Sequence, residues 1–177
     1  AEFSIIKKAV EDFRKIGAEG VVFGILKPDG TLNMEQMKEL MEAAGDMSVT
    51  LHRAFDVCVD PMDTMEQAIS LGIDTILTSG QCNTCLQGAG LLKELQDKSK
   101  GRITIQAGSG VSAEVIRKLY PLTGIKAYHM TGKRVIDSEM KFRKKGVNMG
   151  LPMFSEYEIW RTEADNIRAA KKVLEEL

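Results

Sequence analysis

The sequence predicts an α/β fold built from repeated strand–helix units. Five short apolar segments that favour strands begin at intervals of about 24 to 28 residues, the length that one strand–loop–helix–loop unit requires. The segments between them carry apolar residues three and four positions apart, which is the period of one helix face. The strand segments alternate little between apolar and polar residues, so they favour a parallel sheet with both faces covered.

Local signals support each expected element. Asn33, Asp60 and Ser112 precede apolar-periodic segments and suit a helix N-cap, and Pro61 suits the first helical position. The expected strands are 20–25, 48–52, 75–79, 102–107 and 126–130. Helices are expected near 3–16, 34–41, 61–71, 89–98, 112–120 and 163–177.

Two arrangements of such units remain, an open doubly wound sheet and a (β/α)8 barrel. A barrel commonly needs about 250 residues, whereas this chain has 177 and starts at Ala1 inside a helical pattern. We therefore expect one TIM-barrel-like domain over residues 1–177. It would comprise the C-terminal five βα units, with the first three strands upstream of this chain or missing from it.

The bulk composition is that of an ordinary globular protein, with 44% hydrophobic residues, 28% charged residues and a formal net charge of -1. A near-zero net charge gives no electrostatic footprint for nucleic acid, and no apolar run reaches the roughly 18 residues of a membrane helix. Three cysteines, an odd number, without a secretory leader favour a reducing, cytoplasmic location. We expect no nucleic acid and no membrane as partner, and a homodimer as the default assembly.

Residues with catalytic chemistry follow the second and fifth expected strands. His52, Arg53 and Asp56 come directly after an apolar strand, and His129 lies at the end of the last one. The carboxyl ends of parallel strands share one face, so these side chains are candidates for one site. His52 and His129 would act as acid or base, Arg53 as an anion clamp and Asp56 as an orienter. The alternative is a hydrogen-bonded cluster that ties the strand ends together, and spacing alone does not separate the two.

A glycine-containing turn after the fourth strand resembles an anion cradle. Gly108, Ser109 and Gly110 precede a helix, where backbone N–H groups and the helix N-terminus favour an anion. The alternative is a tight strand-to-helix turn that simply needs glycine. The complete set of candidate anion-binding residues is Arg53, Ser79, Gly80, Gly108, Ser109, Gly110 and Lys133.

Cys82 and Cys85 form a Cys-x-x-Cys pair in a predicted loop. Thiolates suit soft ions such as Cu(I), so this pair is the candidate metal site and copper the candidate cofactor. A redox dithiol or two reduced surface thiols are the alternatives. The second cysteine pair that a closed structural zinc site needs is absent from the sequence.

Six motifs in order along the chain resemble the copper homeostasis protein CutC family. They are GAEGVVFGILKPDG (17–30), VTLHRAFDVCVDP (49–61), ILTSG (76–80), QAGSGV (106–111), AYHMTGK (127–133) and MKFR (140–143). The resemblance covers essentially the whole chain. It implies a TIM-barrel-like fold with three strands before Ala1, a cytoplasmic location and a role in copper handling without a clear catalytic activity.

The resemblance also carries over individual residues. The positions that match the family motifs are His52, Arg53, Asp56, Ser79, Gly80, Gly108, Gly110 and His129. Ser109 stands where the family usually has a glycine, and the Cys82–Cys85 pair lies outside the shared pattern. The leading hypothesis is a copper homeostasis protein that binds Cu(I). The alternatives are a barrel enzyme acting on a small phosphorylated or carboxylate substrate, and a partner-binding scaffold.

Overall fold

The computed structural model describes residues 2–147, 149–151 and 155–177. By its internal contacts the chain divides into two compact units, Ala1–Met130 (unit 1) and Thr131–Leu177 (unit 2). Unit 1 contains alternating helices and strands, and unit 2 contains a strand hairpin followed by a helix. The expectation of a single domain over the whole chain stays a prediction.

Unit 1 is an α/β unit, as the sequence predicts. Its elements are α1 (Glu2–Lys15), β1 (Gly20–Phe23), α2 (Met34–Ala44), β2 (Ser48–Leu51), the 3-10 helix η1 (Arg53–Val57), α3 (Pro61–Ser70), β3 (Thr75–Thr78), α4 (Ala89–Ser99), β4 (Thr104–Ala107), α5 (Ala113–Thr123) and β5 (Ala127–Tyr128). The predicted strands and α-helices are thus confirmed in order for this unit, the 3-10 helix η1 was not predicted, and the fifth strand is shorter than expected.

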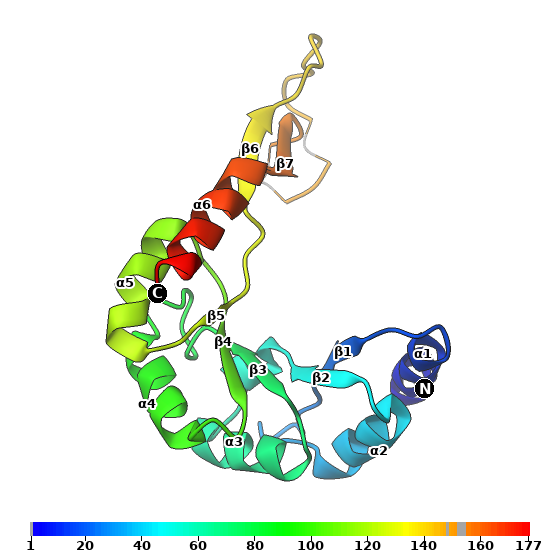
Figure 1. Ribbon diagram of the computed structural model, residues 1–177. Coiled ribbons are helices and arrows are strands. Elements are labelled where there is room, and N and C mark those ends of the chain that lie inside the picture. Colours follow the sequence, from blue (N-terminus) through cyan, green and yellow to red (C-terminus); the bar gives the residue numbers. More distant parts are fainter. Residues whose placement is uncertain (1, 148, 152–154) are drawn as a thin grey trace. The chain divides into compact units, whose positions relative to one another are not determined.

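The five strands of unit 1 form one parallel sheet in the order β1-β2-β3-β4-β5. This order follows the sequence without reversal, whereas a doubly wound sheet reverses at a switch point. The sheet therefore has the topology of consecutive units of a (β/α)8 barrel. Figure 1 shows α2, α3, α4 and α5 following one another along one side of this sheet.

Within unit 1, one face of the sheet is buried against the helices. Val49, Leu51, Ile76 and Ile105 are buried and belong to the hydrophobic core that the helices share. Their neighbours along the strands point to the opposite face, where Val22 is 61% exposed. Within unit 1 the other residues of this second face are half-buried or exposed, and the expectation that both faces are covered stays a prediction.

The predicted helix caps are confirmed. The side chain of Asn33 accepts a hydrogen bond from the N–H of Gln36, and that of Ser112 accepts one from Val115. Asp60 accepts two, from Met62 at 2.9 Å and Asp63 at 3.0 Å, ahead of a proline in the first turn of α3. These contacts satisfy N–H groups that the first turn of a helix leaves without an internal partner.

Unit 2 consists of β6 (Lys133–Asp137), β7 (Glu158–Thr162) and α6 (Ala164–Glu175), and the two strands pair antiparallel. The sequence predicts α6 but neither of the two strands. Every residue of β7 is exposed, and charged residues occupy three of the five positions of β6. Such strands carry no buried apolar run, which is the signal that identified the others. No described helix combines the length and the apolar character needed to cross a membrane.

Two valine substitutions test which face of the sheet is buried. Val49 is fully buried in β2, and Val22 is 61% exposed in β1. We expect Val49→Ala to lower the free energy of unfolding by about 2 kcal/mol, because it removes buried methyl groups and leaves a cavity. Val22→Ala should change it by less than about 0.5 kcal/mol. Urea unfolding measures both values, and equal losses in the two variants would contradict the assignment of the buried face.

Candidate functional site

Four of the predicted site residues lie along one edge of the sheet. The strand register places Thr78 beside Ala107 and Ala107 beside Tyr128, so Ser79, Gly108 and His129 follow at the same level. An added Cβ at Gly108 would lie 3.9 Å from the Cβ of His129. At the neighbouring strand end, Arg53 donates from Nη2 to the hydroxyl of Ser79 at 2.9 Å. We call the set Arg53, Ser79, Gly108 and His129 the strand-end edge.

Asp56 is the acceptor at the centre of this region, and its side chain is only 7% exposed. Its carboxylate accepts from Arg53 Nε at 2.6 Å, from the Thr78 hydroxyl at 2.5 Å, and from the N–H groups of Ser79 and Gln81 at 3.0 and 3.2 Å. Burial opposes its ionisation, but the hydrogen bonds from Thr78, Arg53, Gln81 and Ser79 outweigh burial and hold the pKa of Asp56 below its ordinary value. Asp56 is therefore an ionised brace between η1 and the loop after β3.

The brace fixes the guanidinium of Arg53 without covering it. Arg53 donates a hydrogen bond from Nε to Asp56 and another from Nη2 to Ser79. At the same time, 47% of the Arg53 side chain stays exposed. A guanidinium has five N–H donors in a planar fork, so donors remain for an anion from solution. Arg53 is thus held in a fixed orientation at the carboxyl ends of the strands.

His52 has a structural partner of its own. Its Nδ1 accepts a hydrogen bond from the N–H of Ala54 at 3.1 Å, which caps the start of η1. Nδ1 is therefore unprotonated, and in the neutral ring the proton sits on Nε2. No hydrogen bond joins His52 to Asp56 among the described residues, and the Asp56 oxygens accept from Arg53 and from the loop after β3. His129 is exposed on the strand-end edge, and acid–base roles for either histidine stay predictions.

The glycine-containing turn is tied to the neighbouring loop. Ser109, at φ 71°, donates its hydroxyl to the carbonyl of Asn83 at 2.6 Å and accepts from the N–H of Cys85 at 3.0 Å. The N–H of Gly108 is bonded to the Thr78 carbonyl at 2.9 Å. Within the described chain the N–H groups of Ser109 and Gly110 have no such partner. An anion cradle here would therefore use these two N–H groups and not that of Gly108.

Gly80 and Lys133, two further predicted anion-binding residues, are not part of the strand-end edge as defined above. Gly80 is buried at φ 69°, and an added Cβ would lie 2.3 Å from the carbonyl oxygen of Gly88, so glycine is needed for this close approach. Lys133 belongs to unit 2, where its Nζ lies 3.9 Å from the centre of the Trp160 ring. Its predicted place at the strand-end edge stays a prediction.

The cysteines of the candidate metal site lie in different environments. Cys82 is exposed, whereas Cys85 is fully buried and burial raises the pKa of its thiol. All three cysteines are free. Among the described residues, no three or more His, Cys, Asp or Glu side chains come together in a way that could hold a metal ion. Any metal bound at this pair would have two protein thiolates at most from the chain as described.

Gln81 helps to hold the loop after β3 and was not among the residues that the sequence predicted for the site. Its backbone has φ 56°, and its side-chain amide donates to the carbonyl of Cys58 at 2.9 Å. A left-handed backbone at a non-glycine residue costs energy and needs compensating contacts. No local sequence pattern predicts a left-handed backbone at a glutamine. Only the structure therefore shows that Gln81 holds this loop.

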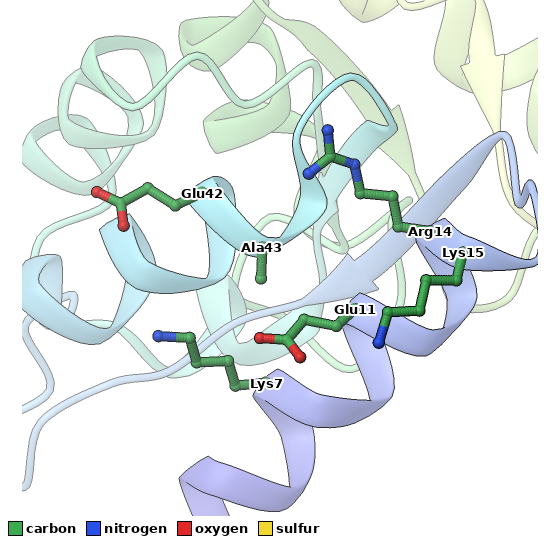
Figure 2. A pocket seen from close by; sticks show the side chains of 6 residues that line it. All are labelled: Lys7, Glu11, Arg14, Lys15, Glu42 and Ala43. Carbon is green, nitrogen blue, oxygen red and sulfur yellow. The ribbon is translucent and has the colours of Figure 1, made fainter.

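A charged hollow of about 560 Å³ lies away from the candidate site, between α1 and α2 (Figure 2). Arg14 and Lys15 end α1, and Ala43 lies at the end of α2, so this hollow borders the segments that lead into the amino ends of β1 and β2. In barrels this end contributes to stability and not to catalysis. Its lining residues are Lys7, Glu11, Arg14, Lys15, Glu42 and Ala43.

The acid sensitivity of the Asp56 brace can be measured. Because the pKa of Asp56 is lowered on folding, its ionised form stabilises the protein above the unfolded pKa of about 3.9, and this contribution is lost as the pH falls through the folded value. We expect Asp56→Asn to lower the free energy of unfolding by about 1–3 kcal/mol at neutral pH, since hydrogen bonds to a charged group are lost. The difference in the free energy of unfolding between Asp56→Asn and the unchanged protein should become smaller below about pH 4.

Urea unfolding at several pH values measures the difference in the free energy of unfolding between Asp56→Asn and the unchanged protein. The control is Asp97→Asn, which removes an exposed carboxylate that pairs only with Lys93 among the described residues. A difference for Asp56→Asn that stays constant from neutral to acidic pH would show that Asp56 does not titrate below its unfolded value.

The comparisons with known proteins agree with the fold and the motifs. The model of the CutC family matches residues 1–134. A CutC protein of Bacteroides fragilis (strain YCH46) is 46% identical over 158 residues, covering 89% of this chain and 63% of that protein. A CutC protein of Bacteroides thetaiotaomicron is 41% identical over 174 residues, covering 98% of this chain and 68% of that protein.

Solved structures give the same result. The crystal structure of CutC from Streptococcus agalactiae, provisionally named a copper homeostasis protein, superposes with a TM-score of 0.69 at 27% identity, covering 72% of this chain and 63% of that one. A mandelate oxidase structure, with a TM-score of 0.50 at 15% identity, shows likeness of fold alone. The chain spans 63% of the length of the Bacteroides fragilis relative. On its sequence match and its fold, the chain belongs to the CutC family.

Proposed function

We propose that this chain serves copper homeostasis, the role named for its Streptococcus agalactiae relative, and that its own working site is an anion-binding strand-end edge. The observation that carries the second part is the fixed, half-exposed guanidinium of Arg53. Asp56 and Ser79 hold this group at the carboxyl ends of parallel strands, which is where ligands bind in barrels.

The guanidinium and backbone N–H donors of the strand-end edge suit a small phosphorylated or carboxylate ligand. A planar guanidinium pairs with two oxygens of such a group, and orientation by Asp56 reduces the side-chain entropy lost on binding. The free N–H groups of Ser109 and Gly110 lie beyond Ser79 along the same set of strand ends. Asp56 offsets part of the charge of Arg53, so we expect only about millimolar affinity for inorganic phosphate, which corresponds to about 4 kcal/mol.

Substitution of Arg53 tests this site. We expect Arg53→Ala to abolish the backbone amide shifts that inorganic phosphate or succinate causes at Ser79 and Gly80 in NMR titrations. Arg53→Lys should retain weakened binding, because an ammonium keeps the charge and loses the planar fork.

The matched control is Lys126→Ala, which removes an exposed cation next to the amino end of β5, at the opposite end of the strands. Equal weakening by Lys126→Ala and Arg53→Ala would mean that general electrostatic attraction causes the shifts. Unchanged binding in Arg53→Ala would contradict the site.

Direct binding of Cu(I) by Cys82 and Cys85 is the second candidate. Two observations favour it: both thiols are free, and they lie on one loop beside the strand-end edge. Ser79 donates its hydroxyl to the carbonyl of Cys82 at 2.5 Å, so the loop is attached to the edge. Thiolates bind Cu(I) well, and a cytoplasmic location would keep these thiols reduced. Because Cys85 is buried, copper binding would have to displace its packing.

A competition experiment tests this candidate. Cu(I) is titrated into the protein under anaerobic, reducing conditions against a chromophoric Cu(I) chelator. If the pair binds copper, Cys82→Ser should lose the stoichiometric site, and Cys58→Ala should keep it because Cys58 is buried and does not belong to the Cys82–Cys85 pair. Stoichiometric binding that survives Cys82→Ser would exclude the pair as the copper site.

A further inference from the structure

Two arginines face each other across the hairpin of unit 2. The register of β6 and β7 pairs Arg134 with Arg161, next to the pair Ile136 and Ile159 on the same face. Like charges directly opposite each other destabilise an antiparallel pair. The hairpin therefore holds a repulsive contact that an anion between the two guanidinium groups would relieve.

A polar hollow lies at these arginines. It has a volume of about 320 Å³, against the roughly 30 Å³ that one water molecule takes in the liquid. The hollow can hold a phosphoryl group together with part of the molecule that carries it. Its lining residues are Arg134, Ile136, Arg161, Thr162, Glu163 and Ala164.

The charges around the hollow do not balance. Arg134 pairs with Glu163 at 3.3 Å, a long contact for an ion pair. Arg161 has no ion pair with another described residue. Asp165, the next carboxylate along the chain, pairs with Arg168 at 2.6 Å. Two guanidinium groups therefore face one carboxylate, which leaves an excess of one positive charge.

Other hydrogen-bond donors converge on the same place. The hollow includes Ala164, the first residue of the 12-residue helix α6, and no side chain caps this helix N-terminus. The N–H of Ala164 makes no hydrogen bond with another described residue. Thr162 also lines the hollow. Donors at a helix N-terminus favour an anion, and here they stand beside the arginine pair.

We propose that this hollow of unit 2 is an anion site that binds a phosphoryl group between Arg134 and Arg161. All of its lining residues belong to unit 2, and the proposal does not depend on the function proposed for the strand-end edge. The site recognises the charge and the oxygens of the phosphoryl group, which either free phosphate or a phosphomonoester presents. A dianion matches the arginine pair better than a carboxylate does, because each guanidinium can pair with its own oxygens.

NMR titration of the whole chain tests the proposal, with the backbone amides of Thr162 and Ala164 as the readout. Inorganic phosphate and glycerol 1-phosphate are the two probes, added at constant ionic strength against chloride. We expect saturable shifts at both amides and at least tenfold weaker binding in Arg161→Gln and in Arg134→Gln. Tighter binding of glycerol 1-phosphate would assign the site to a phosphomonoester, and equal or weaker binding would assign it to free phosphate.

Lys171→Gln is the control, because it removes one positive charge from the far half of α6. It should leave the affinity unchanged, and so should Arg53→Ala in unit 1. Without phosphate, Arg161→Gln should melt no lower than the unchanged protein, since it removes a repulsion. The proposal fails if the shifts do not saturate, if Lys171→Gln weakens binding as much as Arg161→Gln, or if Arg161→Gln melts lower in chloride alone.

Discussion

The buried carboxylate of Asp56 is the group on which the strand-end edge depends. It accepts hydrogen bonds from Arg53 on its own 3-10 helix and from Thr78, Ser79 and Gln81 on the loop after the next strand. A buried carboxylate without such partners would cost several kcal/mol, and the N–H groups of that loop would lose their acceptor as well. Asp56 therefore joins two consecutive strand ends into one structure.

The same connection continues along the sheet. Ser79 binds the carbonyl of Cys82, and Ser109 binds the segment Asn83–Cys85 through its hydroxyl and its carbonyl. Three successive strand ends are thus linked by hydrogen bonds that run from η1 to the glycine-containing turn. These links require a left-handed backbone at Gln81 and Ser109, which costs conformational energy. The hydrogen bonds of both residues compensate for that energy. Arg53 gains its fixed orientation from this chain of contacts.

The groups at the strand-end edge can be compared with those that a copper site needs, since copper homeostasis is the role named for a member of the family. The edge presents a cation and backbone donors, which suit an oxyanion, whereas a copper site needs accessible soft ligands. Only Cys82 of the candidate pair is exposed, because Cys85 packs in the core with the strands and α4. The geometry of the described residues therefore favours anion chemistry at the edge, and a role in copper homeostasis does not require that the edge itself hold the metal.

The sequence by itself determined the α/β class, the order of the elements in unit 1 and the caps at Asn33, Asp60 and Ser112. Periodicity and capping depend on residues one to four positions apart, so they can be recognised without knowing the fold. It also located the candidate residues at strand ends. The β6–β7 hairpin was not predicted because its strands are exposed and carry no buried apolar run.

Only the tertiary structure decided what the candidate residues contact. Asp56 lies 23 residues from Ser79, and Arg134 is opposite Arg161, so both partnerships depend on strand register. The spacing of His52, Arg53 and Asp56 was compatible with acid–base chemistry or with a hydrogen-bonded cluster. The structure shows the hydrogen bonds of Asp56 to Arg53 and to the loop after β3, and the acid–base roles stay predictions. Register is set by the packing of a whole sheet face, which no local stretch of sequence contains.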